Sequence, residues 1–268
     1  MVLDQLLTSR HLWLRFLLVV LTLLLSSGSY ATPYGPYNRS QEQWNIYETQ
    51  HFRFFSTDTT EETLRFLMSI ADETFESLNK FYQYNPKEKL KVTVIGYTSF
   101  SNGFAEYTRD RITIFATPPN FYNRSRVRWL ANVFTHELSH ILSINTSTPF
   151  NSRVPLFLNT GLVRLGNQFQ SLLKIPFFSA NQSHWFREGV AQFDSYLLKR
   201  DSFDENRRAY QRAMTEDNLF YPLQKLSFFG GEKWYNTGLS FLLFIEKKYG
   251  KGTVHQLFKR SGETYFFH

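Results

Sequence analysis

The sequence predicts an α+β fold in which a small mixed β-sheet is followed by a mainly helical region. Short segments with alternating apolar residues lie between residues 51 and 116, and such alternation is typical of half-buried strands. After residue 123, apolar residues recur at the three- and four-residue spacing of helices. With 42% hydrophobic and 20% charged residues, the composition is that of a globular protein.

The first 31 residues have the pattern of a secretory signal peptide. Arg10 and Arg15 precede the apolar run Phe16–Leu25, and small residues end at Ala31, where we expect cleavage. The sequence therefore predicts export to a periplasm or to the exterior. An uncleaved N-terminal membrane anchor is the alternative, although the run is shorter than the roughly 20 residues that a spanning helix needs. The chain has no cysteine, which excludes disulfides and cysteine-ligated zinc.

The mature chain is divided by its residue patterns. Residues 32–50, rich in Pro, Gly, Tyr and Asn, predict an irregular lead-in. Residues 51–268 are expected to form one domain, with an α/β part at 51–122 and a helical part at 123–268.

The α/β part contains three predicted strands and one predicted helix. His51–Ser56 is short and aromatic, and Leu90–Gly96 and Arg111–Ala116 alternate, the latter after a Gly-containing loop. A helix is predicted over Glu61–Tyr84, with Thr59 or Thr60 as its cap. Its apolar stripe comprises Leu64, Leu67, Met68, Ala71, Phe75, Leu78 and Phe81.

The helical part begins with a long, apolar helix predicted from Arg124 to about Ser143. An amphipathic stripe within 162–173 predicts a helix packed over the core. Two further helices are expected at Trp185–Lys199 and Glu232–Tyr249, the second ended by a glycine.

Net charge indicates little about partners. The formal charge is +7, but the basic residues are scattered and no nucleic-acid-binding motif accompanies them, so we expect no nucleic-acid partner. Association with a membrane surface has only this charge and the 162–173 stripe in its favour.

The chemistry of the chain is concentrated in His136-Glu137-Leu138-Ser139-His140, an HExxH run on the first predicted helix of the helical part. Residues four apart on a helix lie on the same face, so both imidazoles can reach one Zn²⁺. Glu137 points about 100° away, towards the position of a metal-bound water.

A catalytic zinc normally has three protein ligands, so one more is needed. Glu188, in Trp185-Phe-Arg-Glu-Gly-Val-Ala191, lies 48 residues after His140 (positions 140 and 188). Gly189 and Ala191 are small, and we expect them to let this helix approach the HExxH helix closely.

With both motifs in order, HELSH and WFREGVA, residues 50–250 resemble the gluzincin metallopeptidases whose second motif is W-x-x-E-G-x-A. The resemblance implies a thermolysin-like zincin catalytic domain with one Zn²⁺ bound by His136, His140 and Glu188. It also implies hydrolysis of peptide bonds in a peptide or protein substrate through a metal-activated water, with Glu137 as the general base.

Two further segments resemble parts of the aminopeptidase branch of this family. Tyr235-Asn-Thr-Gly238 is similar to the Y-x-x-G segment that carries a transition-state tyrosine, which makes Tyr235 a catalytic candidate. The alternative is that Tyr235 is one of the many aromatic core residues. Gly103-Phe-Ala-Glu106 matches only loosely the Gly-rich strand that binds a free substrate N-terminus.

Several alternatives remain open on the sequence. His184, four residues before Glu188, is a rival metal ligand. Gln192 or Asp194 is a candidate to hold a ligand imidazole by a hydrogen bond. A non-enzymatic envelope protein that keeps the fold for binding or assembly is the alternative function, and a damaged site would favour it.

Overall fold

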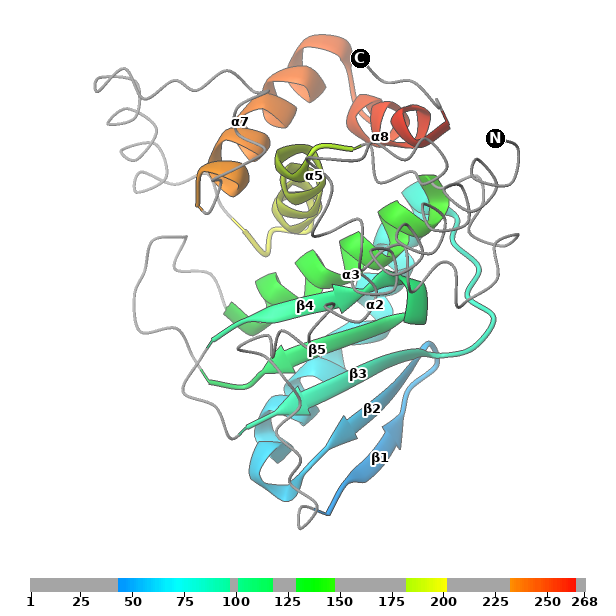
Figure 1. The fold of residues 1–268 in the computed structure, drawn as a ribbon, viewed down its shortest axis with the longest axis vertical. Coiled ribbons are helices and arrows are strands. Elements are labelled where there is room, and N and C mark those ends of the chain that lie inside the picture. The colour runs from blue at the N-terminus through cyan, green and yellow to red at the C-terminus, as the bar shows by residue number, and fades with distance from the viewer. Residues whose placement is uncertain (1–42, 97–100, 118–128, 148–181, 202–231, 264–268) are drawn as a thin grey trace, which may run out of the picture. The chain divides into compact units, whose positions relative to one another are not determined.

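The computed structural model describes residues 43–96, 101–117, 129–147, 182–201 and 232–263. The predicted signal peptide, the stripe within 162–173 and the first residues of the predicted HExxH helix, 124–128, lie outside this part. Figure 1 shows the described elements in colour.

The described strands form one mixed sheet, which confirms the predicted α+β class. In spatial order they are β1 (Asn45–Glu48), β2 (Phe52–Ser56), β3 (Leu90–Ile95), β5 (Arg111–Phe115) and β4 (Gly103–Glu106). The three inner strands are parallel, whereas β1 and β4 pair antiparallel with their neighbours at the two edges.

Both edge strands differ from the prediction. β1 lies within the predicted irregular lead-in, and β4 lies within the predicted loop before residue 111. Each is only four residues long. Each is held by its neighbour, with Asn45 opposite Ser56 in one pair and Gly103 opposite Ile114 in the other.

Helix α2 (Glu61–Tyr82) connects the parallel strands β2 and β3 and passes behind the sheet in Figure 1. Most of its predicted stripe is buried, but Phe81 is 45% exposed. Thr60 occupies the cap position without a capping hydrogen bond from its side chain. Apolar residues of α2, the sheet and helix α3 (Trp129–Ser147) form one core, which includes Phe52, Phe54, Leu67, Leu78, Val92, Ile112, Phe134 and Leu138.

Helix α3 carries the HExxH run and contributes to two cores. Phe134, Leu138 and Ile141 pack in the core of the sheet, whereas Ile144 belongs to a second core. A helix that is apolar on most of its surface is stable only when it is buried. The site residues are therefore carried by a helix that is fixed on several sides.

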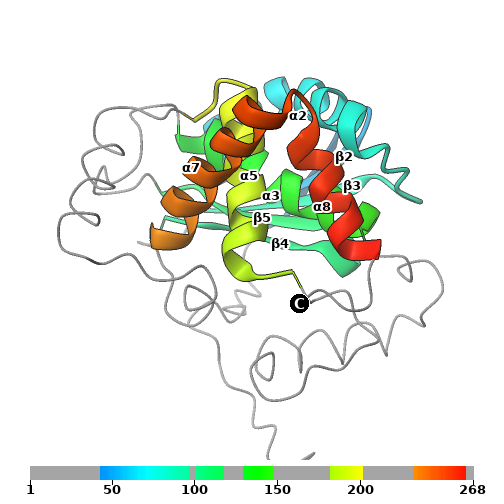
Figure 2. The same ribbon diagram turned by 90° about the horizontal axis from the view of Figure 1, so that it is seen from above.

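The second core joins α3 to three later helices, α5 (His184–Leu197), α7 (Glu232–Tyr249) and α8 (Thr253–Glu263). Figure 1 shows α3 beside β4, α5 beyond α3, and α7 and α8 beyond α5; Figure 2 shows α7 and α8 on either side of α5. The predicted bounds of α7 are confirmed. None of the helices in the described part combines the length and apolar character needed to span a lipid bilayer.

The sequence prediction missed α8. The apolar periodicity of a helix is present in the sequence, because Val254, Leu257 and Phe258 have helical spacing. The carboxylate of Glu246 in α7 accepts hydrogen bonds from the backbone N–H groups of Gly252 and Val254 at the start of α8. This contact replaces the usual capping side chain, which is why the local sequence lacked a start signal.

Candidate metal centre

Helix α3 places two imidazoles next to each other. His136 and His140 are four residues apart, and their ring centroids are 4.7 Å apart with nearly perpendicular planes. Their Nε2 atoms are 3.1 Å apart. Both side chains are largely buried, at 8% and 12% exposure. The helix therefore presents two nitrogen lone pairs to one point, as the spacing predicted.

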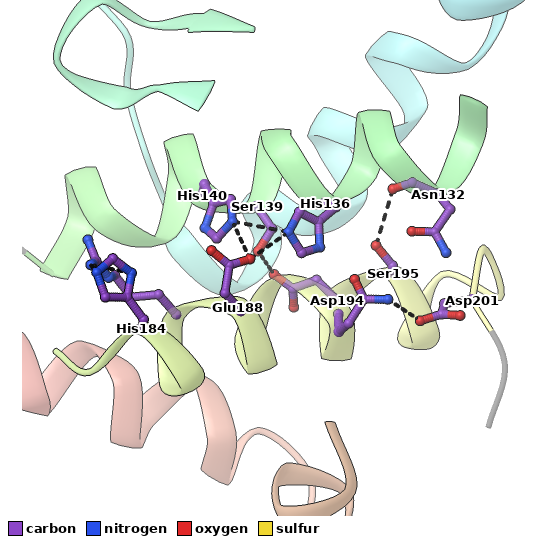
Figure 3. Close-up of polar contacts among 11 residues, drawn as sticks. Asn132, His136, Ser139, His140, His184, Glu188, Asp194, Ser195 and Asp201 are labelled. Atoms are coloured by element: carbon purple, nitrogen blue, oxygen red, sulfur yellow. Dashed lines mark hydrogen bonds and ion pairs between the residues drawn. The ribbon is translucent and has the colours of Figure 1, made fainter. Parts of the chain in front are cut away.

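Helix α5 brings a carboxylate to the same point. Glu188 Oε2 lies 3.0 Å from Nε2 of His136 and 3.3 Å from Nε2 of His140, and Figure 3 shows it reaching between the two rings. In a tetrahedral zinc site with bonds of 2.0–2.1 Å, neighbouring ligand atoms are about 3.3 Å apart. The three described atoms thus have the separations of three corners of such a tetrahedron.

The charges at the site also suit a cation. Burial acts to raise the pKa of Glu188, but the charge of His140 and hydrogen bonds from both imidazoles outweigh it and hold that pKa well below its usual range. Burial acts to lower the pKa of His140, yet the charge and hydrogen bond of Glu188 outweigh it and raise that pKa. A buried carboxylate thus requires positive charge at this point, which a proton or a metal ion can supply.

Among the described residues, His136, His140 and Glu188 are the group of ionisable side chains that can hold a metal ion. The structure brings together the three residues for which the sequence predicted ligand roles. Two imidazole nitrogens and one carboxylate oxygen are a donor set suited to divalent transition metals.

His184, the rival ligand, lies outside this group. Its ring stacks on Trp234 at 5.1 Å, and Nη2 of the buried Arg187 lies 3.2 Å from its Nδ1. Burial, together with the charge of Arg187, lowers the pKa of His184 to about 4. We therefore expect a neutral imidazole that accepts a hydrogen bond from Arg187.

Neither candidate for holding a ligand imidazole does so. Gln192 donates to Asp201 at 2.5 Å, and Asp194 accepts from Tyr82, Ser139 and His255. In the described part of the chain, Nδ1 of each ligand histidine is buried without a hydrogen-bond partner. A ligand imidazole usually donates a hydrogen bond from its second nitrogen. Among the described residues, none accepts such a hydrogen bond from Nδ1 of His136 or His140.

The two catalytic candidates, Glu137 and Tyr235, are described by the contacts they make. Glu137 is 6% exposed, and a Cβ at Gly103 would lie 3.0 Å from its Cγ. Strand β4 therefore passes directly beside Glu137. Tyr235 of α7 has its ring centroid 5.6 Å from that of His136, so the structure places it next to one ligand.

The sequence predicted the wrong neighbouring helix for Gly189. A Cβ at Gly189 would lie 2.9 Å from Cα of Gly238 in α7, and a Cβ at Gly238 would lie 2.6 Å from the carbonyl oxygen of Trp185. The small residue after Glu188 therefore admits α7, not the HExxH helix. Because Tyr235 precedes Gly238 by less than one turn of α7, this close crossing also brings Tyr235 to His136.

Replacing Gly238 with Ala tests this crossing. Helix propensity alone would make the variant more stable by about 1 kcal/mol. We expect instead a loss of about 1–3 kcal/mol in the free energy of unfolding, because the added methyl meets backbone atoms that cannot move aside. Urea denaturation measures the change, with Lys247→Ala on the exposed face of α7 as the control. A more stable Gly238→Ala variant would contradict the contact.

The sequence matches no family model and none of the curated proteins with which it was compared.

Proposed function

We propose that this protein is a zinc-dependent peptidase of the gluzincin type, in which His136, His140 and Glu188 hold the metal. The observation that carries the proposal is the convergence of these three ligand atoms. The HExxH helix and the E-G-x-A helix supply them in the arrangement that the resemblance implies.

Zinc is the metal that we propose for this donor set. Its catalytic sites use three protein ligands from histidine and carboxylate and leave a further position open. Softer metals prefer thiolates, and the chain has no cysteine. Bound by His136, His140 and Glu188, zinc would supply a Lewis acid that activates water for attack on a carbonyl carbon.

Glu137 is the proposed general base. It follows a metal ligand directly in the chain and is turned about 100° from it around α3. A carboxylate in this position takes a proton from the attacking water and then gives it to the leaving amine. Tyr235, beside His136, is proposed to donate a hydrogen bond to the oxyanion that develops on the substrate carbonyl.

The edge strand β4 supports a peptide as the substrate. Strand β4 is one of the two edge strands of the described sheet and pairs only with β5. An extended peptide can add to such an edge through backbone hydrogen bonds. At Gly103 the strand passes Glu137 without a side chain, so a peptide bonded to β4 would carry its backbone close to the proposed base.

The cellular setting is proposed from the sequence alone. We propose an exported protein that acts in a periplasm or outside the cell on peptides or proteins. A damaged site would favour the non-enzymatic alternative. The three proposed ligands lie together and Glu137 is present, so the site does not support that alternative.

Zinc analysis and a peptide-cleavage assay on the purified wild-type chain test the proposed function. We expect about one zinc per chain, cleavage of a mixed peptide library followed by mass spectrometry, loss of cleavage on chelation, and recovery when zinc is added back. A wild-type protein that takes up no zinc under stoichiometric loading would show the proposal to be wrong.

A further inference from the structure

Asp194 of α5 is a fully buried carboxylate that is hydrogen-bonded to three other helices. Its Oδ2 accepts from the hydroxyl of Tyr82 in α2 at 2.6 Å and from that of Ser139 in α3 at 2.5 Å. Its Oδ1 lies 2.8 Å from Nε2 of His255 in α8. Asp194 has 0% exposure, so these hydrogen bonds stabilise the carboxylate where water cannot reach it.

Such a group restricts how the helices can pack. A buried carboxylate that loses a donor is strongly destabilised, because nothing replaces the missing hydrogen bond. The described ion pairs give Asp194 no partner except His255. A fully satisfied buried network therefore favours one arrangement of its helices over alternatives that differ by small shifts.

The arrangement that Asp194 favours is that of the two ligand-bearing helices. Ser139 lies directly before His140 in α3, and Asp194 lies six positions after Glu188 in α5. The helices run antiparallel, as the opposite order of their labelled residues shows in Figure 3. The Ser139–Asp194 hydrogen bond thus crosses between the helices in the same region in which Glu188 meets the two imidazoles.

His255 completes this support from α8. Its ring stacks on Phe81 with centroids 4.2 Å apart and meets Tyr82 edge-on at 5.3 Å. The ring is 6% exposed, so its orientation towards Asp194 is fixed by packing. Helix α8, which contributes none of the proposed ligands, is in this way connected to α5 at Asp194.

We propose that Asp194 is a positioning residue of the metal centre: through Ser139 it sets the register of α5 against α3 and so keeps Glu188 at ligand distance from His136 and His140. This role differs from the contact with a ligand imidazole that the sequence suggested. The inference rests on the proposed zinc site. A metal site is sensitive to ligand displacements of about 0.5 Å.

Asp194→Asn is the principal test, because asparagine keeps the shape but presents one N–H₂ group to partners that must all donate to the aspartate. We expect zinc affinity, measured by competition with a chromophoric chelator, to fall about 10- to 100-fold, as for other residues that orient ligands. We also expect altered visible absorption bands in the Co²⁺-loaded variant, since these bands report the geometry around the metal.

Asp72→Asn is the matched control. Asp72 of α2 also accepts three hydrogen bonds, from Thr49 Oγ1 and the backbone N–H groups of Gln50 and His51. These contacts join α2 to the turn before β2 and touch neither α3 nor α5. We expect Asp72→Asn to change thermal stability but to leave zinc affinity and the Co²⁺ spectrum at wild-type values.

A second pair of variants separates positioning from general stability and serves if Asp194→Asn does not fold. Ser139→Ala and Tyr82→Phe each remove one hydroxyl from the same oxygen of Asp194, but only Ser139 connects α3 to α5. We expect Ser139→Ala to weaken zinc binding and to change the Co²⁺ spectrum, and Tyr82→Phe to lower stability with little change in either.

The outcomes distinguish this inference from the proposed function. A wild-type protein without zinc would show the proposed function to be wrong, and the inference with it. If wild type binds zinc and the folded Asp194→Asn and Ser139→Ala variants bind it equally tightly with an unchanged Co²⁺ spectrum, the inference alone is overturned. Equal losses in Ser139→Ala and Tyr82→Phe would also overturn it, because they would indicate general destabilisation.

Discussion

Glu137→Gln is expected to keep zinc, and its rate of peptide hydrolysis is expected to fall by about 10²- to 10⁴-fold, the range that general-base catalysis contributes. The glutamine amide cannot take a proton from water, whereas His136, His140 and Glu188 are unchanged. Zinc content and kcat, measured on the same preparation, check both halves of the expectation.

The fold of this variant should be intact. Glutamine has nearly the same shape as glutamate, and residue 137 is only 6% exposed. Active-site residues are selected for activity and often cost stability, so we expect a Tm equal to or above that of wild type. Glu62→Gln, on the exposed first turn of α2, is the control for a charge change without effect on catalysis. A Glu137→Gln enzyme with wild-type kcat would remove Glu137 from the mechanism.

Glu188→Gln is expected to lower zinc affinity by more than about 100-fold, the upper figure for residues that only orient ligands. The amide keeps the volume of the carboxylate but removes the negative charge that lies 3.0 Å and 3.3 Å from the two imidazole nitrogens. The measurement is zinc competition at fixed pH and ionic strength.

His184→Ala is the matched control for Glu188→Gln. His184 lies four residues earlier on α5, and the sequence offered it as a rival ligand, but it lies outside the ligand group. We expect zinc affinity to stay within a few-fold of wild type. If His184→Ala loses zinc and Glu188→Gln retains it, the third ligand has been assigned to the wrong residue.

Elements with a strong local pattern were predictable. Helix α7 has the predicted bounds because its helical spacing is ended by Gly250, which has a φ of 101°. Strands β1 and β4 were not predictable in this way. Each is four residues long, and what holds it is a neighbouring strand that local alternation does not reveal.

The same division holds at the site. HExxH is a spacing along one helix, so the direction of both imidazoles follows from α3 alone. The contacts of Gly189 and Asp194 depend on which other helices pack against α5. Helical spacing shows which residues share a face, not which neighbour covers that face. Gly189 was therefore assigned to the wrong helix, and the partners of Asp194 in α2, α3 and α8 were not foreseen.

The partners of Asp194 also bear on the order in which the chain folds. They lie 112, 55 and 61 positions away in the sequence, and contacts between such distant residues form only after long loops have closed. The carboxylate can leave water at low cost only when all three donors are present, and His255 belongs to the last described helix. We therefore expect Glu188 to reach its final position late in folding, after α8 has docked, so that a nascent chain has no complete metal centre until this helix has been made.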